Sequence, residues 1–261
     1  IHYIGLLTVE PIKESDILNI EKWKDDLWLF KKGLSAYYVI DGQQRLTILI
    51  ILLHEILRTF SDDEGINYGQ KSEWIDRFLY RSYNSIYKSF VFGYEKDNPS
   101  DEYFKTKILE QESSTADKYP ETLYTANLMF AKKYFAKKLK VLNKESKESI
   151  FDKVVNRLKF NYYEIDDSLD VYVTFETMNN RGKSLSHLEL LKNRLIYLST
   201  LLHEDDETKG RLRRDINETW KTIYEYLGKN KDNPLDDDTF LFNHWIMYFT
   251  YDRSQSDVYA E

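Results

Sequence analysis

The 261-residue sequence contains no cysteine, and this absence excludes disulfide bonds, thiolate zinc sites and cysteine nucleophiles. A chain without cysteine suits a reducing compartment, so we expect a cytoplasmic protein. An uncharged apolar run of transmembrane length is also lacking. The apolar run at residues 46–57 is too short to span a bilayer and contains His54 and Glu55. We therefore expect no membrane partner, and the sequence shows no signal peptide.

Positive charge is in deficit, because 37 lysines and arginines face 44 aspartates and glutamates, giving a net charge of −7. This balance argues against a protein that is basic over its whole surface and coats nucleic acid. Basic residues nevertheless form two clusters. These are Lys132, Lys133, Lys137, Lys138 and Lys140, and Arg211, Arg213 and Arg214. Such runs usually form solvated helix faces; if either binds DNA, the contacts go to phosphates and are insensitive to sequence.

A polar turn, Asp41-Gly42-Gln43-Gln44-Arg45, separates two apolar runs. Residues 37–40 have strand character and residues 46–60 have helix character. A strand that turns directly into a helix presents free backbone N–H groups and the positive end of the helix dipole, which together suit a phosphate. Arg45 adds a fork of donors, and the two glutamines add neutral donors and acceptors. The turn therefore predicts an anion site.

A structural alternative for this turn needs no ligand. Asp41 is a good N-cap residue, and Gln44, three positions later, completes a pair that resembles a capping box. Such a cap stabilises a helix by about 1 kcal/mol. In this alternative, Arg45 simply pairs with a carboxylate.

A second polar loop at residues 179–184 has the composition of a phosphate-binding element. Gly182 can adopt positive φ and let the backbone approach a ligand, while Arg181 and Lys183 supply charge. The G-x-x-x-x-G-K spacing is absent, which excludes a P-loop NTPase. The alternative here is an ordinary turn between helices that contains glycine.

Residues 38–47, Tyr-Val-Ile-Asp-Gly-Gln-Gln-Arg-Leu-Thr, resemble the signature segment of the GmrSD restriction endonuclease N-terminal domain family, which is related to the ParB/sulfiredoxin-like fold. Residues 175–186 resemble the family's second motif, an Asn, a Gly three residues later and a Leu-Ser pair that opens a helix. Residues 3–9 resemble the strand before the first motif.

The resemblance covers residues 1–200 and departs from the family pattern in two places. An upstream segment with Pro, Gln-Arg and an aromatic residue is not in this sequence, and neither is the downstream nuclease domain of the His-Asn-His type. We expect a fragment of a larger protein.

The resemblance implies that both loops line one pocket, which binds and hydrolyses a nucleoside triphosphate with Mg²⁺ during restriction of modified phage DNA. Arg45 would neutralise phosphate charge, and the two glutamines would orient phosphate or an attacking water. Asp41 would cap the helix, hold a metal-bound water or act as general base. The expected catalytic residues are Asp41, Gln43, Gln44 and Arg45, and the expected cofactor-binding residues are Gly42, Arg45, Thr47, Asn179, Arg181, Gly182 and Lys183.

The expected partners are a nucleoside triphosphate, DNA contacted through its phosphates, and a nuclease domain or subunit. No metal ligands from the protein are expected, because the histidines lack ligand spacing. We interpret His54 as a core or interface residue, whereas His187 could reach the pocket. The alternatives are a module that senses nucleotide or DNA without catalysis, and a structural scaffold.

The predicted fold class is α+β, with a small mixed β-sheet of ParB/sulfiredoxin-like type, a large helical insertion over residues 70–150 and C-terminal helices. We divide the chain into domains at residues 1–200 and 201–261. The predicted strands are 1–9, 36–40 and 160–165, and the predicted helices are 43–60, several within 72–150, 168–178, 186–203, 211–227 and 239–251. The helix at 168–178 follows from the resemblance alone, because its β-branched and aromatic residues favour a strand. Ser186 and Glu189 predict a capping box.

Overall fold

The computed structural model describes residues 1–12, 17, 25–83, 87–94, 99–111, 122–165, 186–200, 202–230 and 232–248. Contacts divide the chain into two compact units, one of residues 1–120 and 124–167 and one of residues 121–123 and 168–261. The predicted α+β class with a small mixed sheet and a helical majority is confirmed. The predicted helix at 168–178 lies outside the described residues. No helix within the described ranges has both the length and the apolar character needed to cross a bilayer.

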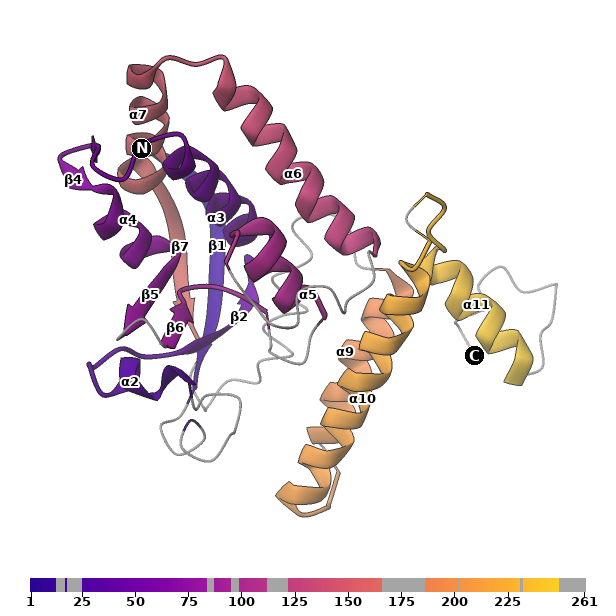
Figure 1. Ribbon diagram of the computed structural model, residues 1–261. Coiled ribbons are helices and arrows are strands. Elements are labelled where there is room, and N and C mark those ends of the chain that lie inside the picture. Colours follow the sequence, from indigo (N-terminus) through magenta and orange to yellow (C-terminus); the bar gives the residue numbers. More distant parts are fainter. Residues whose placement is uncertain are drawn as a thin grey trace. The chain divides into compact units, whose positions relative to one another are not determined.

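The first unit is built on a three-stranded sheet in the order β2-β1-β7 (Figure 1). The central strand β1 (His2–Pro11) pairs antiparallel with β2 (Tyr37–Asp41) and parallel with β7 (Leu158–Glu164). The sheet thus joins the start of the chain to residues that follow the whole insertion. All three predicted strands are confirmed, with small shifts at their ends.

Strand β1 is irregular at two places. Its register slips against β7 between Tyr3 and Leu6, and against β2 between Thr8 and Val9. Gly5 lies in the first irregularity with φ of 115°, a value that side chains other than glycine's rarely allow. Such bulges bend a strand and redirect its neighbouring groups. Here they shape the part of β1 that faces the beginning of α3.

Helix α3 (Gln43–Arg58) follows β2 and forms the centre of the hydrophobic core. Its side chains Ile51, Ile56 and Leu57 are almost completely buried. Each such aliphatic side chain contributes about 1.5–3 kcal/mol when removed from water. The helix also contacts α4 (Lys71–Phe78) and α7 (Lys144–Asp152). The core therefore holds α3 on several sides, and its first turn is fixed beside the sheet.

The insertion between β2 and β7 is not purely helical. Besides α4 and α7 it contains α5 (Pro99–Tyr103), the π-helical turns η2 (Phe104–Ile108) and η3 (Lys153–Arg157), and α6 (Leu123–Lys140). It also contains two antiparallel hairpins, β3 (Gly65–Ile66) with β4 (Gly69–Gln70), and β5 (Tyr80–Tyr83) with β6 (Tyr87–Phe90). The helical pattern predicted across residues 72–150 is therefore wrong at β5 and β6. Their aromatic residues carry the strand preference that decides this segment.

Helix α2 (Leu27–Phe30) belongs to the first unit and lies between β1 and β2 in the sequence. The second unit contains α9 (His187–Thr200), α10 (Asp206–Leu227) and α11 (Asp237–Tyr248). The second unit has its own small core of Leu188, Trp220, Leu227 and Leu241. The predicted capping box of α9 is confirmed, because the Ser186 N–H donates to Glu189 Oε2 at 3.0 Å and the Glu189 N–H donates to Ser186 Oγ at 3.2 Å. The three predicted helices here are confirmed, with shifted ends.

Candidate functional site

A single residue, Gly42, connects β2 to α3. Its φ of 101° turns the chain from strand to helix in one step. A Cβ atom at this position would lie 3.0 Å from Leu7 Cδ1 and 3.3 Å from the Leu6 carbonyl oxygen. Both the dihedral angle and the close approach of β1 therefore require glycine. This turn places the next residues of the motif directly over the irregular part of β1.

The guanidinium group of Arg45 lies against that part of β1. Nη2 donates hydrogen bonds to the Leu6 carbonyl oxygen at 2.5 Å and to Asp41 Oδ2 at 3.0 Å. A Cβ at Gly5 would lie 3.3 Å from Arg45 Cζ, so glycine makes room for the guanidinium plane. The Nε atom is buried without a hydrogen-bond partner, and no described residue accepts a bond from Nη1. The side chain is 39% exposed. Its guanidinium is thus fixed through Nη2 and keeps further N–H donors that bond to no described residue.

Asp41 does not cap the helix, and the capping-box alternative is wrong. Gly42 occupies the N-cap position, and no side chain of the described residues bonds to the first N–H groups of α3. Asp41 is the last residue of β2, and its carboxylate pairs with Arg45 instead. The pairing with a carboxylate that the same alternative proposed for Arg45 is confirmed. The first backbone N–H groups of α3 are consequently available to a ligand or to water.

The two glutamines differ in their environments. Both are exposed, and Gln43 Nε2 donates to the Val39 carbonyl oxygen at 2.5 Å, which folds that side chain back onto β2. Gln44 is exposed in the first turn of α3, and its amide has no hydrogen bond to a described residue. Gln44 therefore has the freer amide for contacting a ligand.

Thr47, expected to contact the cofactor, is buried one turn into α3. Its hydroxyl donates to the Gln43 carbonyl oxygen at 2.9 Å and also bonds to the Tyr94 hydroxyl. Burial raises the pKa of Tyr94, against the opposing effect of the bond with Thr47. Thr47 thus ties the first turn of α3 to a residue of the insertion, and its role as a cofactor ligand stays a prediction.

The donors at this corner are of the kind that bind anions. The open N–H groups and the positive end of a 16-residue helix attract an anion, and Arg45 is already oriented beside them. Asp41 offsets part of the charge of Arg45, so the pair has less net attraction for phosphate than a free arginine. Any anion binding here would therefore depend on positioned donors rather than on excess charge, and the phosphate role of the corner stays a prediction.

The remaining predicted residues Asn179, Arg181, Gly182 and Lys183 lie outside the described residues, so their meeting with Arg45 stays a prediction. His187 belongs to the second unit, and its N–H donates to Asp238 Oδ1 at 2.6 Å. Within the described ranges, no group of three or more acidic or histidine side chains has the arrangement of a metal site.

Two contributors to the corner were missed by sequence reasoning, namely Gly5 and the carbonyl group of Leu6. A glycine inside a strand pattern is a known signal for a bulge or a close backbone approach. The sequence 3–9 carried this signal, but nothing in it indicated which side chain would fill the space.

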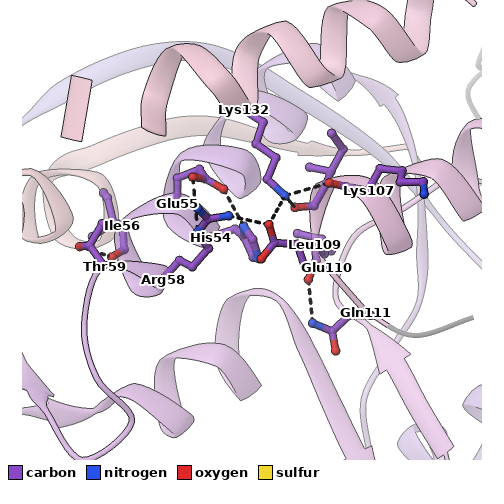
Figure 2. A network of polar contacts seen from close by, with 11 residues as sticks. His54, Glu55, Ile56, Arg58, Thr59, Lys107, Leu109, Glu110, Gln111 and Lys132 are labelled. Carbon is purple, nitrogen blue, oxygen red and sulfur yellow. Dashed lines mark hydrogen bonds and ion pairs between the residues drawn. The ribbon is translucent and has the colours of Figure 1, made fainter. Parts of the chain in front are cut away.

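His54, interpreted as a core residue, is buried, and it belongs to a polar network between α3 and the insertion (Figure 2). Its Nδ1 lies 3.2 Å from Glu55 Oε1, and Arg58 Nη1 donates to Glu110 Oε1 at 2.5 Å. Lys132 Nζ donates to the same Glu110 oxygen at 2.8 Å. Burial alone would raise the pKa of Glu110, but the hydrogen bond and charge of Lys132, with Arg58, hold it below its ordinary value. Lys132 therefore does not belong to the solvated basic face expected for it.

Comparison with known proteins identifies one family. A family model described as "GmrSD restriction endonuclease, N-terminal domain" matches residues 2–196 of the 261. The match includes the corner formed by β1, β2 and α3, and it extends through most of α9. No curated protein matches the chain.

Proposed function

This chain belongs to the GmrSD restriction endonuclease N-terminal domain family, and on that premise we propose that it binds and hydrolyses a nucleoside triphosphate for a modification-dependent anti-phage DNA restriction system. Cleavage of DNA would be carried out by a nuclease domain or subunit that acts with it. The observation that supports nucleotide binding is the arrangement of Arg45. Its guanidinium is fixed by Asp41 and Leu6 beside the uncapped start of α3.

In this proposal the α3 N–H groups and Arg45 hold the phosphates, and Gln44 orients a phosphate oxygen or the attacking water. Mg²⁺ carried by the nucleotide would neutralise developing charge, and it needs few protein ligands. Asp41 has two candidate roles. It either receives the proton of the attacking water or only positions Arg45.

A binding module without hydrolysis is the second candidate, and the Asp41–Arg45 ion pair favours it. A carboxylate that is bonded to arginine must weaken that bond in order to accept a proton. In this case the nucleotide would act as a sensed ligand rather than a substrate.

Two variants test the proposal on the purified chain. Arg45→Ala should weaken nucleotide binding and lower turnover, measured by titration and by phosphate release in the presence of Mg²⁺. Arg58→Ala removes an arginine from the other end of the same helix, where it contacts Glu110, and serves as the matched control. Unchanged affinity and turnover in Arg45→Ala would refute the phosphate role of this corner.

Asp41→Asn separates the two roles of Asp41. If Asp41 is the general base, turnover falls by about 10²-fold or more while binding is retained. If it only positions and partly neutralises Arg45, the freed positive charge should strengthen nucleotide binding. If the unmodified chain binds nucleotide without turnover, the result favours the binding module over the hydrolase.

A further inference from the structure

The outer face of α6 combines exposed aromatic rings with unpaired positive charge. The helix Leu123–Lys140 contains five lysines and no aspartate or glutamate, in a chain whose net charge is −7. Lys132 is buried in the polar network, whereas Lys133, Lys137, Lys138 and Lys140 are exposed and form no ion pair with any described residue. The basic cluster in the sequence is therefore two features, one structural lysine and four lysines on the surface.

Two rings lie among these lysines. Phe130 is 71% exposed and Tyr134 is 48% exposed, and their rings stack with centroids 6.5 Å apart at 23°. Lys138 Nζ lies 5.6 Å from the centroid of Tyr134. Positions 130, 134 and 138 are each four residues apart, so they share one face of the helix. At a rise of about 1.5 Å per residue, this face extends for about 12 Å from Phe130 to Lys138.

Neither ring nor charge is explained by packing within the first unit. The buried side of α6 is formed by Thr125, Leu128, Lys132 and Leu139, which leaves Phe130 and Tyr134 on the side away from the core. A phenylalanine as exposed as Phe130 next to a second exposed ring is an apolar patch, and such patches commonly mark contact surfaces. The surrounding lysines require that the partner be anionic.

We propose that this face of α6 binds single-stranded DNA, with Lys133, Lys137 and Lys138 on the phosphates and Phe130 and Tyr134 stacking on unpaired bases. A single strand presents phosphates for the lysines and unpaired bases for the rings within a few nucleotides. Proteins that bind single strands without sequence preference commonly combine aromatic rings with basic side chains. Duplex DNA would satisfy the lysines but would keep its bases away from the rings. The proposal extends the proposed function, in which DNA is the target, by naming the surface and the strand state.

Binding of the full chain to a fluorescent oligothymidine of about 20 nucleotides, without nucleotide, tests this surface by anisotropy. Omitting nucleotide separates this test from the nucleotide proposal, which stands or falls on turnover. Phe130→Ala and Tyr134→Ala should each weaken binding by about 5-fold or more. Because both rings are exposed, the variants should keep the far-UV circular dichroism of the parent chain.

The lysines are tested through salt dependence. Replacing Lys133, Lys137 and Lys138 together by Gln should reduce the slope of log affinity against log salt by about 2, at about 0.7 per lost phosphate contact. The control replaces three other exposed lysines of the same unit by Gln, namely Lys31, Lys153 and Lys159, and changes the net charge equally.

Three results would overturn the proposal. One is an equal loss of binding in the control triple variant, which would indicate only net charge. Another is duplex of the same length binding as tightly as the single strand with no effect of Phe130→Ala. The third is binding to anionic phospholipid vesicles without binding to the oligonucleotide.

Discussion

Replacing Lys132 by methionine tests whether the polar network fastens α6 to the rest of the first unit. The ammonium group donates to the carbonyl oxygens of Lys107 and Ile108 at 2.8 and 2.7 Å and to Glu110 at 2.8 Å (Figure 2). Those carbonyls belong to the last two residues of η2. Lys132 therefore satisfies acceptors of the insertion from a neighbouring helix.

The expected cost follows from what the substitution leaves behind. Methionine keeps the apolar stem of the side chain, so packing is largely preserved, but the buried Ile108 carbonyl loses the ammonium donor. A buried acceptor left without a partner costs about 1–3 kcal/mol. Glu110 is 46% exposed and retains Arg58, so it adds little. We expect a loss of about 1–3 kcal/mol in the free energy of unfolding.

Lys133→Met is the matched control, because it makes the same change one residue later on the exposed side of α6. Its unfolding free energy should stay within about 0.5 kcal/mol of the parent. Urea unfolding followed by tryptophan fluorescence measures both variants. Equal midpoints for Lys132→Met and Lys133→Met would refute the reasoning.

Two further outcomes follow from other contacts. Gly5→Ala should destabilise the chain by about 1–3 kcal/mol more than Gly33→Ala, as measured by urea unfolding. Both glycines have positive φ, but only at Gly5 would a Cβ meet a neighbour, the guanidinium of Arg45. Equal losses of stability would contradict this close approach. Lys144 holds the pKa of Glu64 near about 2 against an ordinary 4.5, so the stability from ionised Glu64 is complete above pH 4.5 and disappears as the pH falls through about 2. Thermal unfolding of Glu64→Gln should therefore vary less over this pH window than that of the parent chain, and parallel curves would exclude the contribution.

The sequence predicted the elements around the corner well, because each has a clear local pattern. Residues 37–40 read as a strand, the apolar run from residue 46 as a buried helix, and both are confirmed. The roles within the turn were harder to predict. Asp41 is a residue type that commonly forms N-caps, yet its carboxylate accepts a hydrogen bond from Arg45. The one-residue connection through Gly42 leaves the aspartate in the strand, so Gly42 takes the N-cap position.

Tertiary contacts explain what the sequence could not predict. The partner of Arg45 on β1 is a backbone carbonyl, and a backbone acceptor has no signature in the side-chain sequence. Lys132 was grouped with neighbouring lysines because sequence distance gives no burial. Only Glu110 and the end of η2, more than 20 positions away, assign it to the interior. Strand β5 was not predicted, because the helical pattern of the neighbouring residues was assumed to continue through residues 80–83.

Because β1 pairs in parallel with β7, β1 is synthesised long before this partner strand is available. His2 is opposite Leu158, so the first strand of the sheet leaves the ribosome long before its second neighbour exists. At about 5–20 residues per second, the intervening stretch takes roughly 8–30 s to translate. Through that interval one edge of β1 carries unsatisfied main-chain groups, and the nascent protein is open to mispairing with other chains. Slowing elongation within the insertion should therefore raise the aggregated fraction, whereas the antiparallel β1–β2 pair can assemble early.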